Sequence, residues 1–398
     1  MKKQDKTHTT KDIQPLKILV YPLAPQNPYQ NLLYSSLSDN HPVQIKFLKM
    51  PTTLQGFLFQ ICIGLYELVS DRIRGYRILH IHWLYQLSFP GKAIWPWLSH
   101  AVTTLLVRVF LAAADLLGYR IIWTVHDVVP HFKMTFNDVA MSQLLINRSD
   151  TLLMLSSATL DKIDEYGLNY DPTKAIIIPH GNYIGSYPNN ISKSMARQKL
   201  GINEDSFAYL FFGTVLPYKN ASGMLEAFKS IVKEHSEAII IIAGNPGTPE
   251  IRKELKDAKT QLGDRLILHA DFVPDQEVQT YFNASDVVVF PYLRITNSGV
   301  ALLAASFGKP IVAPLLGAFK DLPAKSGVFY KAGDQAELQA AMKQVITKGS
   351  TLGSMSHAAL QYAQSLSWDT IASMTYDVYR QQRLDSTPEK HDGTSHRL

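Results

Sequence analysis

The segment of greatest chemical interest runs from Phe290 to Gly317, where an apolar run, a polar loop and a helix-forming stretch follow one another. The run Val287–Phe290 is continuously apolar, which is typical of a parallel strand covered on both faces. The sequence TNSG at 296–299 then supplies capping side chains just before Val300–Phe307. Free backbone N–H groups and the helix dipole at such a start attract anions. The pattern therefore predicts an anion site, although an ordinary strand–helix–strand crossover would show it too.

Histidines and one aspartate near the ends of two other apolar runs could move protons. His80 and His82 alternate around the run Ile78–Ile81, so they share one face, and His126 and Asp127 directly follow another such run. A neutral histidine or a carboxylate can accept a proton near neutral pH. Zinc is a weaker interpretation of the paired histidines, since no carboxylate stands at a suitable spacing. A capping aspartate and a hydrogen-bonded buried histidine are the structural alternative.

The composition is that of a soluble globular protein with two domains. The 398 residues are enough for two cores, and 46% hydrophobic with 18% charged residues is an ordinary balance. The one cysteine, Cys62, excludes an internal disulfide and a cysteine-based zinc site, and it fits a reducing compartment. The net charge of +5 comes without a basic stripe, so nucleic acid is not an expected partner. The polar residues 1–15 show no secretory signal and are expected to be disordered.

Short apolar runs alternate with helix-forming stretches along most of the chain. They end in polar or glycine-containing loops, which predicts parallel strands with the chemistry at their carboxyl ends. The predicted strands are Ile18–Tyr21, Ile78–Ile81, Ile121–Val125, Leu152–Leu155, Ala175–Ile178, Ala208–Phe212, Ile239–Ala243, Leu266–Ala270, Val287–Phe290, Ile311–Ala313 and Val328–Tyr330. We predict an N-terminal domain at 16–190, a C-terminal domain at 191–366, a final helix at 367–383 and a disordered tail at 384–398.

Two helical segments of the first half are unusually apolar. Leu54–Val69 is followed by Arg72, Arg74 and Arg77, and Ile94–Leu117 is rich in leucine and alanine. The first segment is shorter than the roughly 20 residues that span a bilayer, and the second contains charged residues. Both could be core helices, or one could lie on an anionic membrane with arginines near the lipid phosphates.

Four motifs of the second half occur in the order and spacing of one enzyme family. They are the sequences at 212–220 (FGTVLPYKN), 243–245 (AGN), 272–274 with 281–286, and the stretch at 290–317 described above. Through them the second half resembles the donor-binding domain of the GT-B glycosyltransferases, bacterial cell-surface enzymes that act on nucleotide sugars. The first half matches more weakly, through the loop after its first strand and the sequence TVHD at 124–127. The resemblance implies an α/β fold with two Rossmann-like domains facing each other across a cleft, and a C-terminal helix that returns to the N-terminal domain.

The resemblance also implies a donor-binding set. Lys219 matches the family lysine that contacts the donor diphosphate, where its charge would stabilise the departing nucleotide. Gly213 matches the glycine that lets the backbone approach the phosphates, and Phe272 and Val273 match the loop that holds the base. A solvated lysine and a structural phenylalanine are the alternatives. The full predicted donor-binding set is Gly213, Thr214, Lys219, Asn245, Phe272, Val273, Tyr292, Arg294, Asn297, Ser298, Gly299 and Val300.

The sequence departs from the family at its E-x7-E carboxylate pair. Ile295 and Leu303 stand at those positions, or Thr296 and Ala304 if the loop is shifted by one, and Thr214 replaces the usual arginine. None of them can hold the ribose or the sugar as a carboxylate would, which argues against a retaining mechanism. The polar and cationic members of the donor-binding set after position 290 would then have to bind the donor instead.

The resemblance places the acid–base role at the end of the strand Ile121–Val125. We predict Asp127 as the base that takes the proton of the acceptor hydroxyl, with His126 as orienter or phosphate partner, and the two roles could be reversed. Lys219 completes the predicted catalytic set. The predicted acceptor-binding residues are Tyr29, Gln30 and His82. The first two could equally belong to a simple turn ahead of a helix.

These features together predict a glycosyltransferase that moves a sugar from a UDP- or GDP-linked donor to a glycan or lipid-linked acceptor in bacterial surface polysaccharide synthesis. No metal ion or other cofactor is expected, and the chain has no D-x-D motif. The expected location is the cytoplasm, at the inner face of the plasma membrane if the apolar segments bind lipid. A non-catalytic partner of another glycosyltransferase and a nucleotide-sugar epimerase of the same fold are the alternatives.

Overall fold

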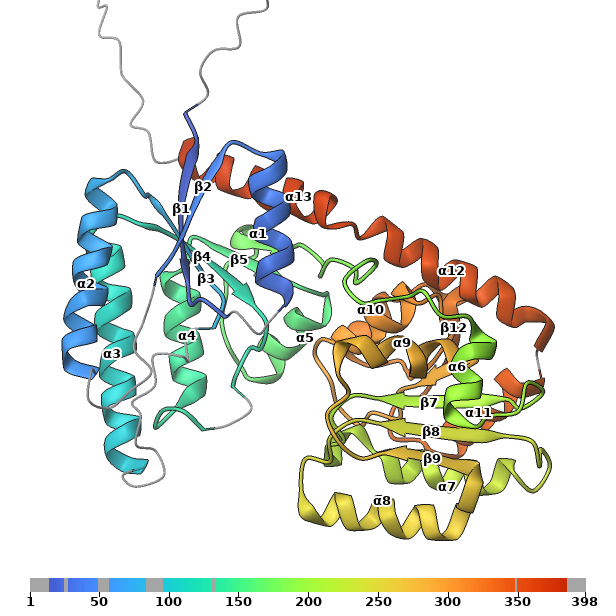
Figure 1. Ribbon diagram of the computed structural model, residues 1–398. Coiled ribbons are helices and arrows are strands. Elements are labelled where there is room, and N and C mark those ends of the chain that lie inside the picture. Colours follow the sequence, from blue (N-terminus) through green and yellow to red (C-terminus); the bar gives the residue numbers. More distant parts are fainter. Residues whose placement is uncertain are drawn as a thin grey trace, which may run out of the picture. The chain divides into compact units, whose positions relative to one another are not determined.

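The computed structural model describes residues 14–24, 28–48, 57–83, 96–130, 133–347 and 349–384. They form two compact units, each built around a parallel sheet (Figure 1). The N-terminal unit contains the chain up to Leu155, Ile163–Ile178 and the chain from Trp368 onward, and the C-terminal unit contains Ser156–Lys162 and Pro179–Ser367. The predicted α/β fold with two Rossmann-like domains is confirmed. Apart from residues 14, 15 and 384, the disordered leader and tail predicted from the sequence lie outside the described residues, as does the side chain of Cys62.

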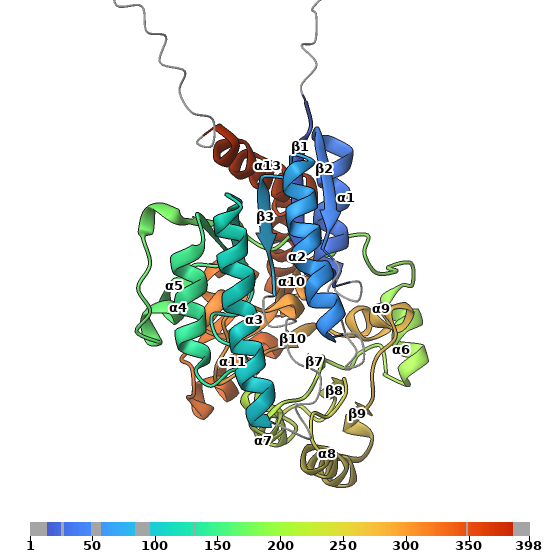
Figure 2. The same cartoon turned by 90° about the vertical axis from the view of Figure 1, so that its left-hand side faces the viewer.

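The sheet of the N-terminal unit has six parallel strands in the order β2-β1-β3-β4-β5-β6. The strands are β1 Leu16–Tyr21, β2 Val43–Phe47, β3 Ile78–Ile81, β4 Arg120–Val125, β5 Thr151–Met154 and β6 Ala175–Ile177. The helices that follow them are α1 Pro28–Asn40, α2 Phe57–Ile73, α3 Pro96–Leu116, α4 Asp138–Arg148 and α5 Ala158–Glu165. Figure 2 shows α2, α3 and α4 as a layer in front of this sheet, with α1 behind it.

The last helix, α13 (Trp368–Leu384), completes the core of the N-terminal unit. It packs along α1, where the Ser36 hydroxyl donates to an Asp369 carboxylate oxygen at 2.7 Å. Apolar residues of both helices, including Leu33 and Ile371, are buried in one cluster over the sheet. The predicted return of the C-terminal helix to the N-terminal domain is therefore confirmed, and the helix begins at Trp368, one residue after the predicted start at 367.

The sheet of the C-terminal unit also has six parallel strands, in the order β12-β11-β10-β7-β8-β9. The strands are β7 Ala208–Phe212, β8 Ile239–Ala243, β9 Leu266–His269, β10 Val287–Val289, β11 Ile311–Pro314 and β12 Gly327–Tyr330. The helices are α6 Lys193–Leu200, α7 Ala221–Ile231, α8 Pro249–Leu262, α9 Asp275–Ala284, α10 Gly299–Ser306, α11 Gln335–Thr347 and α12 Leu352–Ser365, with the short turn η3 at Pro217–Lys219. Buried aliphatic residues of β7, β8 and β10 form the centre of its core, as expected for strands covered on both faces.

The segment at 179–190 packs with the C-terminal unit, whereas the sequence pattern ended the N-terminal domain at 190. The amide of Asn182 donates to the carbonyl of Leu366 at 2.8 Å, and the amide of Asn190 donates to the side chain of Gln279 at 2.8 Å. These bonds join residues far apart in the chain. Residues 179–190 therefore form a loop of the C-terminal unit.

Candidate functional site

In the C-terminal unit, the loops after β7 and β8 start side by side. The amide of Gly213 donates to the carbonyl of Ala243, and the amide of Gly244 donates to the carbonyl of His269, both at 2.9 Å. A Cβ atom at Gly244 would stand 2.1 Å from the carbonyl oxygen of Gly213, so only glycine fits at this position. The close approach brings two of the predicted donor-binding loops to the same edge of the sheet.

The ammonium group of Lys219 lies at this edge. Lys219 ends the turn η3 after β7, and its Nζ is 5.4 Å from the ring centroid of Tyr292, within the range of a cation–π contact. A Cβ atom built on Gly213 would stand 3.9 Å from the same Nζ and 3.4 Å from Cγ2 of Val300. The structure therefore brings together four residues of the predicted donor-binding set.

Burial changes the ionisation of this lysine. Loss of hydration lowers the pKa of the Lys219 ammonium to about 8, because the charged form is the one that water stabilises. A bound anion would restore a favourable interaction and raise the pKa again. Lys219 is therefore suited to bind an anionic group such as a diphosphate.

The helix α10 begins beside Lys219. Ser298 caps it as predicted, since its Oγ accepts a hydrogen bond from the amide of Ala301 at 3.2 Å. Val300 is the second residue of α10 and also the neighbour of Gly213 described above. The N–H groups at this helix start and the Lys219 ammonium consequently belong to one site, with the polarity that an anion requires.

His180 and Tyr183 border the same helix start and were not among the predicted residues. A Cβ atom at Gly299 would stand 3.0 Å from the hydroxyl of Tyr183. The hydroxyl of Tyr183 is 3.3 Å from Nε2 of His180, whose Nδ1 donates to the carbonyl of Gly181 at 2.6 Å. Burial lowers the pKa of His180 to about 4, so the ring is neutral near pH 7. The signal that could have found it is the position of His180 just past Pro179, at the end of the apolar run 175–178.

The other aromatic and cationic members of the predicted set differ in exposure. Arg294 is exposed, and its guanidinium is 5.4 Å from the ring centroid of Tyr218. Phe272, after β9, is 74% exposed, so its ring is open to stacking, whereas Val273 is 7% exposed and belongs to the core. Tyr292 is also buried, and its contribution to the site is the ring face that contacts the Lys219 ammonium.

Polar residues complete the set. Thr214 and Asn245 are exposed in the loops after β7 and β8, and Asn245 accepts a long hydrogen bond of 3.5 Å from Arg252. Asn297 accepts a hydrogen bond of 2.8 Å from the hydroxyl of Ser156. Exposed or half-buried polar groups thus follow β7, β8 and β10, which are neighbours in the sheet.

The positions of the family's carboxylate pair serve packing in this chain. Leu303 is buried within α10, and Ile295 packs against the core of the C-terminal unit. A Cβ atom at Gly317 would stand 2.3 Å from the carbonyl of Ile295, so the loop is held closely against its neighbour. Lys219, Arg294 and the start of α10 offer positive charge to a ligand here.

In the N-terminal unit, three histidines meet through a tyrosine. Nδ1 of His82 is 3.1 Å from Nε2 of His126, and Nε2 of His82 is 2.7 Å from the hydroxyl of Tyr34. The same hydroxyl is 2.9 Å from Nδ1 of His80. The predicted shared face of His80 and His82 is confirmed. Within the described residues, no group of three or more His, Cys, Asp or Glu side chains is placed to hold a metal ion.

The hydrogen bonds continue from His80 in two directions. Its Nδ1 is 2.6 Å from the hydroxyl of Tyr379 in α13, and its Nε2 is 2.7 Å from the hydroxyl of Thr124 in β4, which in turn bonds the hydroxyl of Tyr29. We name the connected side chains the histidine chain: Tyr29, Thr124, His80, Tyr379, Tyr34, His82 and His126. Burial lowers the pKa of His80 to about 3 and that of His82 well below its ordinary value, with a smaller repulsion from the neighbouring histidines. Both rings are therefore neutral near pH 7.

His126 is held on several sides at the carboxyl end of β4. Its ring stacks on that of Trp83, with centroids 4.2 Å apart, and the ring of Tyr29 meets it edge-on at 5.0 Å. His126 and the adjacent Asp127 are both half-buried. The predicted acid–base pair thus combines a fixed imidazole with a carboxylate at the next position.

The residues predicted to contact an acceptor are turned into the N-terminal unit. Gln30 is fully buried, and its amide donates to the carbonyl of Pro22 and accepts from the amide of Ala24, both at 2.8 Å. Tyr29 and His82 are 3% and 2% exposed and belong to the histidine chain. Because their polar groups already have protein partners, we assign these residues to shaping the loop after β1 and supporting His126.

Comparison with known proteins identifies the chemistry. Residues 192–364 match the family described as glycosyl transferases group 1. The chain is a glycosyltransferase. This glycosyltransferase is 25% identical over 294 residues to the GDP-mannose:glycolipid 4-beta-D-mannosyltransferase of Xanthomonas campestris pv. campestris, and the match covers 74% of the chain and 71% of that protein. It is also 28% identical over 228 residues to a D-inositol 3-phosphate glycosyltransferase of Geodermatophilus obscurus, covering 54% of the chain and 49% of that protein.

Solved structures share the fold of this glycosyltransferase. A sucrose-phosphate synthase from Thermosynechococcus elongatus superposes with a TM-score of 0.67 at 16% identity, covering 94% of the chain and 100% of that protein. Alr3699/HepE from Anabaena, in complex with UDP, superposes with a TM-score of 0.66 at 18% identity, covering 92% of the chain and 100% of that protein. At such identities the likeness concerns the fold alone, which is the predicted GT-B fold.

Proposed function

We propose that this glycosyltransferase moves a hexosyl group from a UDP- or GDP-linked sugar to a lipid-linked saccharide or another glycan in the synthesis of a bacterial surface polysaccharide. The observation that carries the proposal is the Lys219 ammonium beside the start of α10, in the unit that matches the glycosyltransferase family. A relative is named for a GDP-mannose donor and a glycolipid acceptor, and a protein of the same fold was solved with UDP. These relatives support a nucleotide-sugar donor and a glycolipid acceptor for this chain.

In this proposal, Lys219 and the N–H groups at the start of α10 bind the donor diphosphate. When the bond between the anomeric carbon and the phosphate oxygen breaks, its electron pair stays on that oxygen and negative charge builds on the diphosphate. The ammonium group of Lys219 stabilises that charge. Arg294, in the segment just before α10, offers a second cation. With these groups the transfer requires no metal ion.

The proton of the acceptor needs a base. The acceptor hydroxyl oxygen forms the new bond to the anomeric carbon while its proton passes to the carboxylate of Asp127. His126, fixed by its stacking on Trp83, orients a reacting group beside that carboxylate.

Donor binding and transfer are tested in sequence. A thermal-shift panel of UDP-glucose, GDP-mannose and ADP-glucose should show one donor that raises the melting temperature. With that donor and a bacterial glycolipid extract, the protein should release nucleoside diphosphate, Lys219→Ala should abolish the release, and Lys229→Ala on α7 should leave it unchanged. Conversion of the nucleotide sugar without any acceptor would favour an epimerase. A protein that binds no donor and co-purifies with another chain would be a non-catalytic partner.

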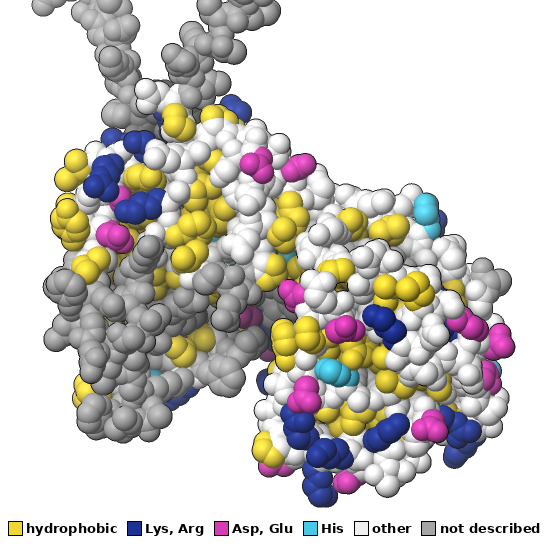
Figure 3. All heavy atoms as spheres, viewed as in Figure 1, with side chains coloured by type: hydrophobic (Ala, Val, Ile, Leu, Met, Phe, Trp, Pro, Cys, Tyr) yellow, Lys and Arg dark blue, Asp and Glu magenta, His cyan; other side chains and the backbone are white. Residues whose placement is uncertain are grey.

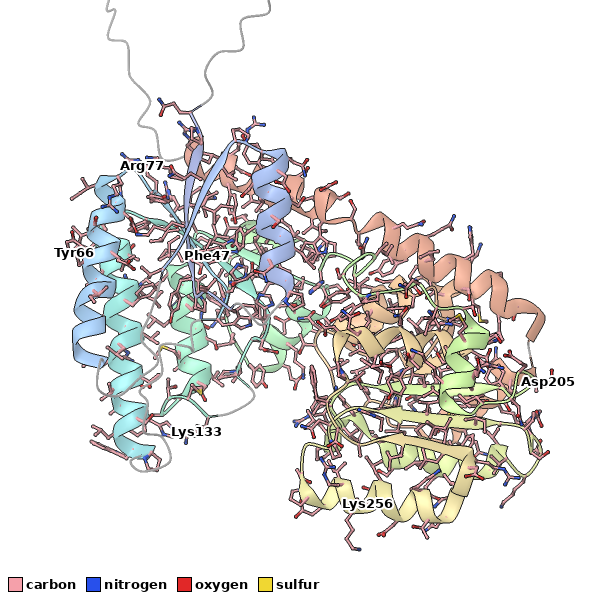
Figure 4. All side chains as sticks on the ribbon, viewed as in Figure 1. Phe47, Tyr66, Arg77, Lys133, Asp205 and Lys256 are labelled. Carbon is pink, nitrogen blue, oxygen red and sulfur yellow. The ribbon has the colours of Figure 1, made fainter. Side chains whose placement is uncertain are left out.

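We also propose that the enzyme works in the cytoplasm at the inner face of the plasma membrane, docked through one face of the N-terminal unit. The α2–α3 face, as we name it, consists of the exposed apolar residues Ile63, Tyr66, Val69, Ile73, Trp97, Leu98, Leu105, Val109 and Leu116. Tyr66 points outward from α2 (Figure 4), and hydrophobic side chains lie at the outer edge of this unit beside lysines and arginines (Figure 3). An apolar helix face with basic residues at its border is suited to an anionic lipid surface.

Much of the apolar surface of helix α3 is exposed to solvent. It is long and apolar enough to cross a membrane, with a mean hydropathy of 1.5 over its most apolar stretch, of which 33% is buried. It nevertheless packs against α2, α4 and β4 within the helical layer of the sheet. A helix held in this way lies along a membrane surface more readily than across it.

A basic cavity borders the end of α2. It has a volume of about 280 Å³ and lies at the amino ends of β1, β3 and β4. Its charged lining residues are Lys17, Arg74, Arg77, Arg120 and Arg383, without a carboxylate among them. Of these five cations, Arg120 pairs with Asp150 and Arg74 pairs with Asp71. The remaining excess of positive charge suits lipid phosphates next to the apolar face.

Vesicle flotation at low salt tests the docking. The protein should float with vesicles of phosphatidylcholine and phosphatidylglycerol. Tyr66→Ser with Leu105→Ser should weaken this binding, and Arg74→Gln with Arg77→Gln should remove the preference for the anionic lipid. Leu315→Ser, an exposed position of the C-terminal unit, is the matched control. A wild-type protein that stays in the supernatant contradicts the proposal.

A further inference from the structure

The contacts of His80 determine where protons lie in the histidine chain. A neutral imidazole has one N–H and one lone pair on its two nitrogens. Nδ1 of His80 is within hydrogen-bond distance of two hydroxyl oxygens, those of Tyr34 at 2.9 Å and Tyr379 at 2.6 Å. If Nδ1 were unprotonated, it could accept a hydrogen bond from only one of the two hydroxyls. The lone pairs of the other hydroxyl oxygen would then point at the Nδ1 lone pair and repel it. As an N–H donor it satisfies both, so the proton of His80 belongs on Nδ1.

With that proton placed, the other bonds have one consistent direction. Nε2 of His80 accepts from the hydroxyl of Thr124 at 2.7 Å. Tyr379 donates to Tyr34, because the reverse direction would leave the buried Tyr379 hydrogen without an acceptor among the described residues. Tyr34 then donates to Nε2 of His82.

The series of hydrogen bonds ends at His126. Since Nε2 of His82 accepts from Tyr34, the neutral ring of His82 carries its proton on Nδ1. That N–H donates to Nε2 of His126 at 3.1 Å. A neutral His126 therefore carries its own proton on Nδ1, and its Nε2 lone pair is already engaged.

We propose that the histidine chain holds His126 in this tautomer, so that His126 takes part in sugar transfer as a hydrogen-bond donor through Nδ1 while Asp127 accepts the acceptor's proton. The inference rests on the proposed function, in which these two residues act together. It decides between the two assignments that the sequence left open. Tyr34 and His82 are positioning residues, because they act on the reaction only through His126.

The hydrogen bonds of the histidine chain keep this donor-to-acceptor direction because its histidine rings stay neutral. Burial lowers the pKa of His80 and of His82, so neither ring takes up a second proton near pH 7. The groups that face them from α1, β4 and α13 are tyrosine and threonine hydroxyls and the ring of His126. A proton taken up by His126 thus has no favourable place further along the chain.

Nitrogen NMR of the full-length protein labelled with ¹⁵N-histidine tests the tautomer. His126 is assigned by the signals that His126→Asn removes. We expect a pyridine-type shift for Nε2 and a pyrrole-type shift for Nδ1, and a pyrrole-type Nε2 in the wild-type protein overturns the proposal. The wild-type spectrum gives the tautomer, and the folded His126→Asn variant is needed only to assign the His126 signals.

Two tyrosine variants test the chain itself. Tyr34→Phe keeps the ring but removes the hydroxyl that directs His82, so the His126 signals should shift toward a mixture of tautomers. Tyr209→Phe is the matched control, since its buried hydroxyl donates to the carbonyl of Met342 in the other unit. We expect about a tenfold loss of kcat/KM in Tyr34→Phe and none in Tyr209→Phe. Unchanged His126 signals in a folded Tyr34→Phe protein would refute the role of the chain.

Kinetics of His126 variants separate this inference from the proposed function. Asparagine keeps an N–H donor but cannot accept a proton, so His126→Asn should retain activity that His126→Ala loses, whereas Asp127→Asn should lose at least about a hundredfold. Equal losses in the Asn and Ala variants overturn the donor role. Full activity in both removes His126 from the proposed function, and the NMR spectrum still reports the tautomer independently.

Discussion

The hydroxyl oxygen of Tyr379 lies 2.6 Å from Nδ1 of His80, although 299 positions separate the two residues in the sequence. The contact joins α13, the last helix, to β3 in the middle of the N-terminal sheet. It also makes α13 part of the histidine chain that ends at His126. Packing of the last helix and positioning of a proposed active-site residue are consequently linked.

Tyr379→Phe should destabilise the N-terminal unit and slow the transfer. The variant removes one acceptor of His80 and the donor to Tyr34, and a lost buried hydrogen bond costs about 1–2 kcal/mol. Thermal unfolding and the transfer assay measure the two effects. Tyr376→Phe, a half-buried tyrosine on the same helix, should change stability by less than about 0.5 kcal/mol. Equal melting temperatures for the two variants would argue against the contact.

Donor affinity should fall as the pH rises through about 8. Lys219 has a pKa of about 8 in the free protein, so at pH 9 only about a tenth of it carries the charge that attracts the diphosphate. Calorimetry should therefore show binding about tenfold weaker at pH 9 than at pH 7. Lys219→Arg, whose guanidinium stays charged, should bind with the same affinity at both pH values. A wild-type affinity independent of pH would show that this ammonium does not contact the donor.

The lowered pKa of Lys219 has the opposite effect on folding stability, which should increase as the pH rises. The folded-state pKa of Lys219 lies below its ordinary value, so folding carries an unfavourable contribution below pH 8. That contribution fades as the pH rises from 8 toward the ordinary value. Lys219→Met should therefore raise the melting temperature at pH 7 while abolishing donor binding. A variant that melts at a lower temperature than the wild type would count against a buried charge.

Gly244→Ala should disrupt the start of both donor loops. The new Cβ would stand 2.1 Å from the carbonyl oxygen of Gly213, at a φ of +153°, so we expect a loss of about 2–4 kcal/mol. Gly263→Ala is the control, since that residue has a φ of +56° and no atom within 4 Å of the added Cβ. It should cost about 1 kcal/mol. Similar unfolding temperatures for the two variants would mean that the strand ends can separate freely.

Chelation should leave the transfer reaction intact. In the proposed function the charge of the departing diphosphate is balanced by Lys219 and the start of α10 rather than by a divalent ion. The rate of nucleoside diphosphate release should be the same with and without an excess of EDTA. Loss of activity in EDTA that added magnesium restores would contradict this prediction.

Local patterns predicted most of the fold where strands are buried. β3, β7 and β8 have the predicted ends. β7 and β8 are apolar runs that stop before Gly213 and Gly244, and β3 is an apolar run around His80 that starts after Arg77. β2 was missed, since Val43–Phe47 lies at the edge of its sheet, alternates apolar with polar residues and is only partly buried. The attachment of residues 179–190 to the C-terminal unit depends on bonds to Leu366 and Gln279, which no local pattern reveals.

The site was predictable to the extent that topology determines it. Parallel strands bring their carboxyl ends to one edge, which is why Gly213, Lys219 and Val300 meet. The inward direction of Gln30 could not be predicted, because alternation and helix spacing show which residues share a face but not which neighbours fill their hydrogen bonds. Tyr183 was missed because it lies in a loop without periodicity, where only the folded chain brings it to α10.

The assignment of α13 to the N-terminal unit has a consequence for synthesis of the protein. The chain leaves that unit after Ile178 and re-enters it at Trp368. Until α13 emerges from the ribosome, α1 has no cover for Leu33 and its buried neighbours. The first domain to be translated is therefore the last to reach its final packing, and it has to persist as an incomplete, apolar intermediate while the second domain folds.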